Sequence, residues 1–180
     1  MSACISPIDP AVAEGRTRQQ LDGVKKTLGV VPNMMRTMAH SPALLEGYLG
    51  FSAALAKGAL RPAVREQLSL AVSQVNGCEY CLSAHSYFGA HAKLSPDQLQ
   101  AAREGEAEDP QAQAALTLAL DLIDRRGDLS DEQLADARRA GLSDAEIAEV
   151  VGHVALSTLT NYFNQLAQTE VDFPRVPVSV

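Results

Sequence analysis

The sequence contains no tryptophan, and aromatic residues make up only 4 % of its 180 positions. Alanine and leucine are abundant instead, and these residues favour helices that pack through small side chains over a β-sandwich. No run of 18 apolar residues is present, so no segment is expected to cross a bilayer as a helix. The composition therefore favours an all-α fold, and the lack of a long apolar run argues against membrane spans.

Clusters of positive charge are also missing. The chain has 15 Lys and Arg residues against 22 Asp and Glu residues, which gives a formal net charge of −7. Proteins that bind nucleic acid gather basic residues on one face or along one helix, and here they are scattered. The first ten residues have neither a basic region nor an apolar region of a secretory signal. We therefore expect a cytoplasmic protein without nucleic-acid or membrane partners.

Cysteine is scarce, with three residues in the chain, and only Cys78 and Cys81 lie close together in sequence. Three cysteines are too few for a disulfide framework. In a reducing compartment, a C-x-x-C pair indicates catalysis or metal binding more often than structural cross-linking. The third cysteine, Cys4, is expected to be a free thiol without a role.

Turn and cap signals divide the chain into helices within a single domain, residues 1–180. A proline after Arg61 starts one helix, Asn76-Gly77 ends it, and Ser143 with Glu146 forms a capping box for a long apolar helix. Residues 1–9 are predicted to form a mobile arm, and residues 171–180 an extended tail on the surface or on a neighbouring subunit. The predicted helices cover about 10–28, 32–39, 44–57, 62–76, 78–92 and 144–168, with others starting after Ser95, Asp109 and Ser130.

A weak internal repeat accompanies this pattern. Apolar residues at 64, 68 and 71 match those at 147, 151 and 154 at one offset, each in a helix that follows a proline or serine start. Three matches at helical spacing arise easily by chance, so an internal duplication is one of two open alternatives.

The segment from Asn76 to His85 has the spacing of a dithiol redox site. If a helix begins near Cys78, then Cys81 lies one turn into it and His85 one turn further along the same face. The helix N-terminus would lower the pKa of a thiol there, and the imidazole could take its proton. Glu66 lies on the preceding helix, at similar depth if Gly77 turns the chain into an antiparallel hairpin. It is therefore the best candidate to orient His85, although it could instead be a solvated surface charge.

These residues form a pattern known from one family. A glutamate, eleven intervening residues and then C-x-Y-C-x-x-x-H resembles the alkylhydroperoxidase D-like (AhpD-like) core of the carboxymuconolactone decarboxylase family. The similarity extends over roughly residues 30–170, and the stretches 31–33, 76–85 and 161–164 look like the peroxidase-related branch. The resemblance implies an AhpD-like helical bundle that assembles into trimers or hexamers.

The resemblance also implies roles for individual residues. Cys81 would be the peroxidatic cysteine, Cys78 the resolving cysteine, and His85 with Glu66 the proton relay, without a cofactor. The substrate would be hydrogen peroxide or a small organic hydroperoxide, and a thiol of unknown identity would reduce the disulfide. Tyr80 departs from the pattern, because alkylhydroperoxidase D has a second histidine there. A tyrosine could donate a hydrogen bond, but it is a poor base near pH 7.

Other interpretations of the same residues remain open. Cys78, Cys81 and His85 could bind zinc if His91, Glu66 or His153 supplied a fourth ligand. A non-redox role is a second alternative, either a ligand-binding helical oligomer or a lyase-like enzyme that would work without its cysteines. His153, inside an apolar helix, could be a core histidine or could line a pocket near the dithiol. The role of Asn161, two turns later, is left open.

Overall fold

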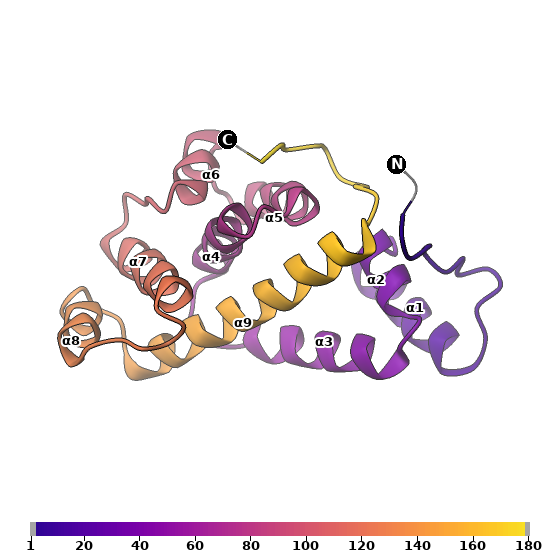
Figure 1. The fold of residues 1–180 in the computed structure, drawn as a ribbon, viewed down its shortest axis with the longest axis horizontal. Helices are drawn as coiled ribbons and strands as arrows, with labels where there is room; N and C mark the ends of the chain where they lie inside the picture. The colour runs from indigo at the N-terminus through magenta and orange to yellow at the C-terminus, as the bar shows by residue number, and fades with distance from the viewer. Residues whose placement is uncertain (1–2, 179–180) are drawn as a thin grey trace.

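The structure, a computed structural model, describes residues 3–178, so the predicted arm and tail each have two terminal residues outside the described part. The described residues form nine α-helices and no strand, and this confirms the predicted all-α fold (Figure 1). The helices are α1 (Gly15–Leu28), α2 (Asn33–Met38), α3 (Pro42–Leu55), α4 (Pro62–Val75), α5 (Glu79–His91), α6 (Pro96–Arg103), α7 (Pro110–Asp124), α8 (Asp131–Arg139) and α9 (Asp144–Ala167).

Helix α4 is the centre of the bundle, where it packs against α5, α6, α7 and α9 (Figure 1). Its sequence explains this position, because eight of its residues are buried, including the serines at 69 and 73. Small side chains let neighbouring helices approach closely on more than one side. The long helix α9 runs past α4, α3 and α5, and its C-terminal half therefore reaches the start of α5.

The turn between α4 and α5 follows from Gly77, whose φ of 67° lies in the left-handed region that glycine adopts without strain. The chain reverses there, and Cys78 N donates to Ser73 O over 2.9 Å. Cys78 is the N-cap of α5, and its Sγ accepts a hydrogen bond from Cys81 N at 3.3 Å. The predicted helical hairpin is therefore present, and it brings the cysteines to the N-terminal end of α5.

The arm predicted at residues 1–9 contacts the helical bundle in its described part, residues 3–9, and its mobility stays a prediction. The backbone N–H groups of Cys4 and Ile5 both donate to Ala167 O, which is an otherwise open carbonyl at the end of α9. Arg36 and Ile8 also exchange two hydrogen bonds, one through the guanidinium and one through the backbone. The first helix begins later than expected, at Gly15, because a turn precedes it in which Ala11 N donates to Asp9 Oδ1 and Val12 N donates to Asp9 O.

The described part of the tail, residues 171–178, has no helix or strand, and it does not lie only on the surface. Phe173 is half-buried against the hydrophobic cluster that contains Tyr80 and Cys81, and Val176 N donates to Ser83 Oγ at 3.0 Å. The tail therefore closes one side of the region around the cysteines, which a purely peripheral segment would not do.

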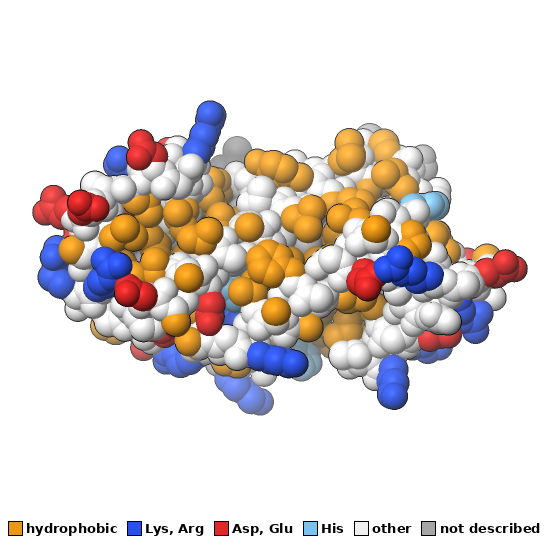
Figure 2. All heavy atoms as spheres, turned by 90° about the horizontal axis from the view of Figure 1, so that it is seen from below, with side chains coloured by type: hydrophobic (Ala, Val, Ile, Leu, Met, Phe, Trp, Pro, Cys, Tyr) orange, Lys and Arg blue, Asp and Glu red, His pale blue; other side chains and the backbone are white. Residues whose placement is uncertain are grey.

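The surface carries several exposed apolar side chains. Val151, Leu159, Tyr162 and Leu166 on α9 and Phe51 on α3 are each more than a third exposed. Figure 2 shows hydrophobic side chains across the middle of one face, with most charged side chains toward its ends and lower edge. No helix in residues 3–178 has the length and apolar character needed to cross a bilayer. The predicted trimer or hexamer stays a prediction, as does the internal duplication, although the two matching helices, α4 and α9, do pack against each other.

Candidate active site

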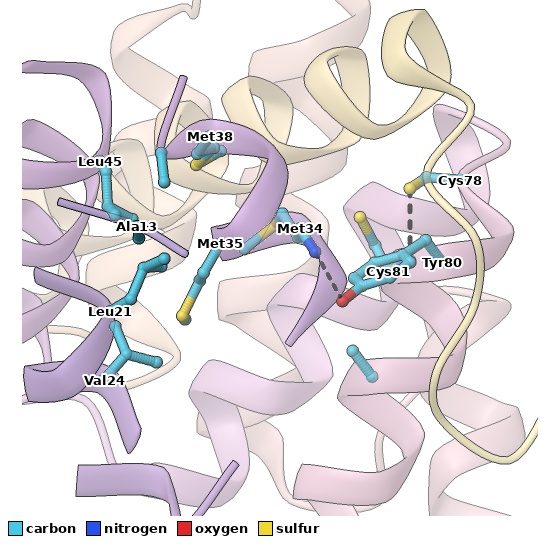
Figure 3. Close-up of a cluster of buried hydrophobic side chains, with 12 residues drawn as sticks. Ala13, Leu21, Val24, Met34, Met35, Met38, Leu45, Cys78, Tyr80 and Cys81 are labelled. Carbon is cyan, nitrogen blue, oxygen red and sulfur yellow. Dashed lines mark hydrogen bonds between the residues drawn. The ribbon is translucent and has the colours of Figure 1, made fainter. Parts of the chain in front are cut away.

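The two cysteines lie side by side at the start of α5, and both are almost completely buried (Figure 3). Neither forms a disulfide in this structure. The Cys78 thiol is hydrogen-bonded to the Cys81 sulfur, and this interaction has opposite effects on the two groups. It raises the pKa of Cys78, with burial as the next cause, so Cys78 keeps its proton and donates it to Cys81.

Cys81 has the opposite character. Burial alone would raise the pKa of its thiol, but four neighbours outweigh burial and lower the pKa to about 6. They are the Cys78 thiol, the positive charge of His85, and the side-chain amides of Asn164 and Asn161. A thiolate is the reactive form of cysteine, and the lowered pKa favours that form at Cys81 near pH 7.

His85 lies one turn after Cys81 and contacts the carboxylate that the helical hairpin brings from α4. Its Nδ1 is 2.8 Å from Oε2 of Glu66, and both side chains are largely buried. Burial lowers the pKa of His85, but the hydrogen bond and charge of Glu66, and then the charge of Cys81, outweigh it and raise the pKa. The imidazolium is therefore favoured beside the thiolate, and the structure brings together Cys78, Cys81, His85 and Glu66.

Helix α9 supplies two buried amides that the sequence reasoning did not place at the thiols. Asn164 Nδ2 donates to Cys81 Sγ at 3.3 Å. Asn161 Nδ2 donates to Ser73 Oγ at 3.1 Å, and its Oδ1 accepts from Asn76 Nδ2 at 2.9 Å. Two asparagines three residues apart in an otherwise apolar helix were the available signal, because buried amides need partners.

Tyr80 has a structural role in the site. Its hydroxyl accepts a hydrogen bond from Met34 N at 3.2 Å (Figure 3). Its ring packs edge-on against Phe173, with centroids 5.8 Å apart. Burial is the main cause that raises the pKa of its hydroxyl, so the group stays protonated. The structure therefore places Tyr80 between α2 and the tail, where its hydroxyl holds the start of α2.

Two cavities meet near His85. One has a volume of about 60 Å³ and is mainly apolar, with Cys81, Met35, Phe88 and Phe173 among its walls. The other is polar, has a volume of about 170 Å³, and is lined by Glu66, Ser69, His153 and other residues of α3, α4 and α9. His85, Tyr48 and Thr160 line both, so these three residues lie between the apolar space at Cys81 and the polar space behind it.

The other histidines do not join the cysteines. His91 Nδ1 is 2.8 Å from Tyr87 O in its own helix, and His153 lines the polar cavity behind His85, where burial lowers the pKa of its ring. Across residues 3–178, no group of three or more His, Cys, Asp and Glu side chains is placed to hold a metal ion. The zinc alternative therefore gains no geometric support.

A sequence comparison relates the central part of the chain to a known family. Residues 42–124, which include the whole α4–α5 hairpin, match the model of the carboxymuconolactone decarboxylase family. This match covers a little under half of the chain. The whole chain has an AhpD-like helical fold, as the resemblance in the sequence predicted.

Solved structures agree with this fold. A peroxidase-related protein with an alkylhydroperoxidase AhpD core, from Ralstonia eutropha JMP134, is 23 % identical, with a TM-score of 0.84 over 98 % of this chain and 100 % of that one. A peroxidase-related protein from Silicibacter sp. TM1040 is 19 % identical, with a TM-score of 0.78 over 93 % and 92 % of the two chains.

A carboxymuconolactone decarboxylase fold also supports other chemistry. The debrominase Bmp8, in complex with 2,3,4-tribromopyrrole, is 20 % identical to this chain, with a TM-score of 0.77 over 96 % and 93 % of the two chains. No curated protein matches the sequence significantly. At these identities the likeness concerns the fold, and the reaction has to be argued from the site itself.

Proposed function

We propose that the protein is a thiol-dependent peroxidase that reduces hydrogen peroxide or a very small organic hydroperoxide through Cys81 and Cys78. The observation that carries the proposal is the buried Cys81 sulfur, whose pKa is lowered to about 6 beside a second thiol that keeps its proton. A nucleophile and a proton-bearing resolving thiol in direct contact are what two-step peroxide reduction needs.

In the first step, the Cys81 thiolate attacks the terminal oxygen of the hydroperoxide and the O–O bond breaks. Cys81 becomes a sulfenic acid, and the leaving alkoxide or hydroxide takes the proton that His85 holds. Glu66 orients the imidazole through the 2.8 Å contact and stabilises its charged form. The proton originally on Cys81 therefore ends on the alcohol or water that leaves.

In the second step, Cys78 attacks the sulfenic sulfur and the disulfide forms. The hydroxide that leaves takes the Cys78 proton and becomes water. The two steps together consume one hydroperoxide and two thiols, and they yield an alcohol or water, one further water and the Cys78–Cys81 disulfide. A thiol reductant must then return the pair to its starting state.

The size of the apolar cavity supports peroxide over a larger substrate. Its volume of about 60 Å³ and its mainly apolar walls suit a small hydroperoxide better than a polyhalogenated ring. Dehalogenation, the reaction suggested by the name of Bmp8, and a non-redox lyase reaction therefore both receive less support from this site.

Single-turnover oxidation of cysteine variants tests the proposal. Wild-type protein should lose both thiols after one equivalent of hydrogen peroxide. Cys78→Ser should consume one equivalent and stop as a sulfenic acid, whereas Cys81→Ser should not react at an appreciable rate. Cys4→Ser is the matched control and should behave as wild type. A Cys81→Ser protein with full turnover would refute the proposal.

A further inference from the structure

A polar groove lies outside the cysteines, on the side away from the apolar cavity. It has a volume of about 600 Å³ and lies between the start of α5, the end of α9 and the tail. Figure 3 shows the chain after α9, in yellow, passing beside Cys78. The residues that line it are Gly77, Cys78, Glu79, Tyr80, Asn164, Gln165, Gln168, Thr169, Glu170, Val171 and Arg175.

The two members of the redox pair line different spaces. Cys78 lines the polar groove but not the apolar cavity, and Cys81 lines the apolar cavity but not the groove. Tyr80 lines both, so its ring, packed against Phe173, forms the wall between them. An oxidant in the apolar cavity therefore approaches Cys81, whereas a molecule in the groove approaches Cys78.

Two residues that line the groove carry buried polar atoms that lack partners. In residues 3–178, four buried side-chain oxygen or nitrogen atoms have no hydrogen bond, and two of them are Asn164 Oδ1 and Thr169 Oγ1. An unpaired buried polar atom is costly, so a ligand that reaches both atoms through a small side-chain movement and pairs them gains affinity. Asn164 Oδ1 needs a donor, and the Thr169 hydroxyl can donate or accept.

We propose that this groove binds the reductant, and that the reductant is a peptidyl thiol, meaning a cysteine thiol carried on a peptide backbone, which attacks Cys78. A peptide N–H can donate to Asn164 Oδ1 and a peptide C=O can accept from Thr169, which a simple alkyl thiol cannot do. The inference rests on the proposed function, because it concerns the reduction of the disulfide that the peroxidase forms.

The chemistry of the pair also selects Cys78 as the point of attack. In thiol–disulfide exchange, the sulfur with the lower thiol pKa is the better leaving group. Attack at Cys78 releases Cys81 as a thiolate, which the Asn164 amide and His85 stabilise. Attack at Cys81 would instead release Cys78, whose pKa is raised.

Two peptidyl thiols reduce the Cys78–Cys81 disulfide in two exchange steps. The reductant thiolate attacks Cys78 Sγ, the Cys78–Cys81 bond breaks, and its electron pair goes to Cys81 Sγ. A second peptidyl thiol then attacks the reductant sulfur of the mixed disulfide. Cys78 leaves, takes a proton and becomes a thiol, and the reductant is released as its own disulfide.

Peptide mapping of the mixed disulfide tests the site of attack. The wild-type protein is oxidised with diamide, mixed with glutathione, and quenched rapidly with excess N-ethylmaleimide. We expect glutathione on Cys78 and maleimide on Cys81. Glutathione found mainly on Cys81 would overturn the proposal.

A hydroxyl deletion tests the peptide contact. Thr169→Val should slow reduction by glutathione by roughly two- to tenfold, the effect of one hydrogen bond. Reduction by 3-mercaptopropionate, which lacks a peptide backbone, should be unchanged. Thr117→Val, which removes an exposed hydroxyl on α7, is the matched control. Equal slowing of both thiols by Thr169→Val would contradict a peptide-binding groove.

These tests separate the inference from the proposed function because diamide, not a hydroperoxide, forms the disulfide. If diamide oxidises Cys78 and Cys81 but a hydroperoxide does not, the proposed peroxidase function is refuted. If glutathione then maps to Cys78, the proposal that the groove binds the reductant is still supported. A pair that hydroperoxide oxidises but glutathione attacks at Cys81 would refute only the groove.

Discussion

Removal of the Asn164 amide should raise the pKa of Cys81 by a predictable amount. Asn164 Nδ2 donates to Cys81 Sγ at 3.3 Å, and both side chains are buried. A hydrogen bond to a charged group contributes about 1.5–3 kcal/mol, and one pKa unit corresponds to about 1.4 kcal/mol. Asn164→Leu, which keeps the branched shape of the side chain but has no donor, should therefore raise the pKa of Cys81 from about 6 by roughly 1 to 2 units.

The direction of the pH effect follows from this shift. A lowered pKa means that the thiolate is present above about pH 6 and is lost as the pH falls. At pH 7, the thiolate share should drop from about nine-tenths in the wild type to between about one-half and one-tenth in Asn164→Leu. Well above both pKa values the two proteins should react alike, because Cys81 is then ionised in each.

The assay is the rate of iodoacetamide alkylation of Cys81 against pH, followed by peptide mapping so that Cys78 and Cys4 are counted separately. Gln165→Leu is the matched control, because this exposed neighbour donates its amide to Asn76 O and not to a thiol. The midpoint of its curve of alkylation rate against pH should equal that of the wild type. A midpoint in Asn164→Leu that also equals the wild-type value would refute the argument that this amide stabilises the thiolate.

Three further predictions concern the relay, the cavity and the fold. Glu66→Gln removes the carboxylate that raises the pKa of His85, so the alkaline limb of the pH profile for single-turnover oxidation should move to lower pH. An alkaline limb at the wild-type position would exclude Glu66 as the residue that raises the pKa of His85. Phe173→Ala removes a wall of the apolar cavity and should increase the rate with cumene hydroperoxide relative to hydrogen peroxide, and an unchanged ratio would argue against this cavity as the substrate site. Glu149 accepts from Ala59 N at 2.7 Å and Leu60 N at 2.9 Å, so Glu149→Ala should lower the free energy of unfolding in urea by about 1–3 kcal/mol. The exposed Glu108→Ala should have little effect, and similar losses in both variants would show that these hydrogen bonds do not stabilise the fold.

Local sequence signals were sufficient for the helical hairpin. Asn76-Gly77 marks a turn because glycine adopts a left-handed conformation, and the spacing from Cys78 to His85 places side chains on one helical face. The depth argument for Glu66 needed only the rise per residue along two antiparallel helices. In the structure its carboxylate lies 2.8 Å from the His85 ring.

Contacts between distant parts of the chain could not be predicted in the same way. Asn164 reaches Cys81 across 83 positions, and Ala167 O accepts the N–H groups of Cys4 and Ile5. Periodicity shows which face of a helix is apolar but not which helix it meets, so the asparagine had no assigned role. The hydrogen bonds from residues 3–9 to α9 and to Arg36 were likewise not predicted.

Intact mass and peptide mapping of the reduced protein, before and after one equivalent of hydrogen peroxide, test the central claim most directly. The account predicts a loss of two hydrogens within seconds, localised to a Cys78–Cys81 disulfide, with Cys4 still a free thiol. Free thiols at both Cys78 and Cys81 after this treatment would contradict the claim that the two cysteines reduce peroxide.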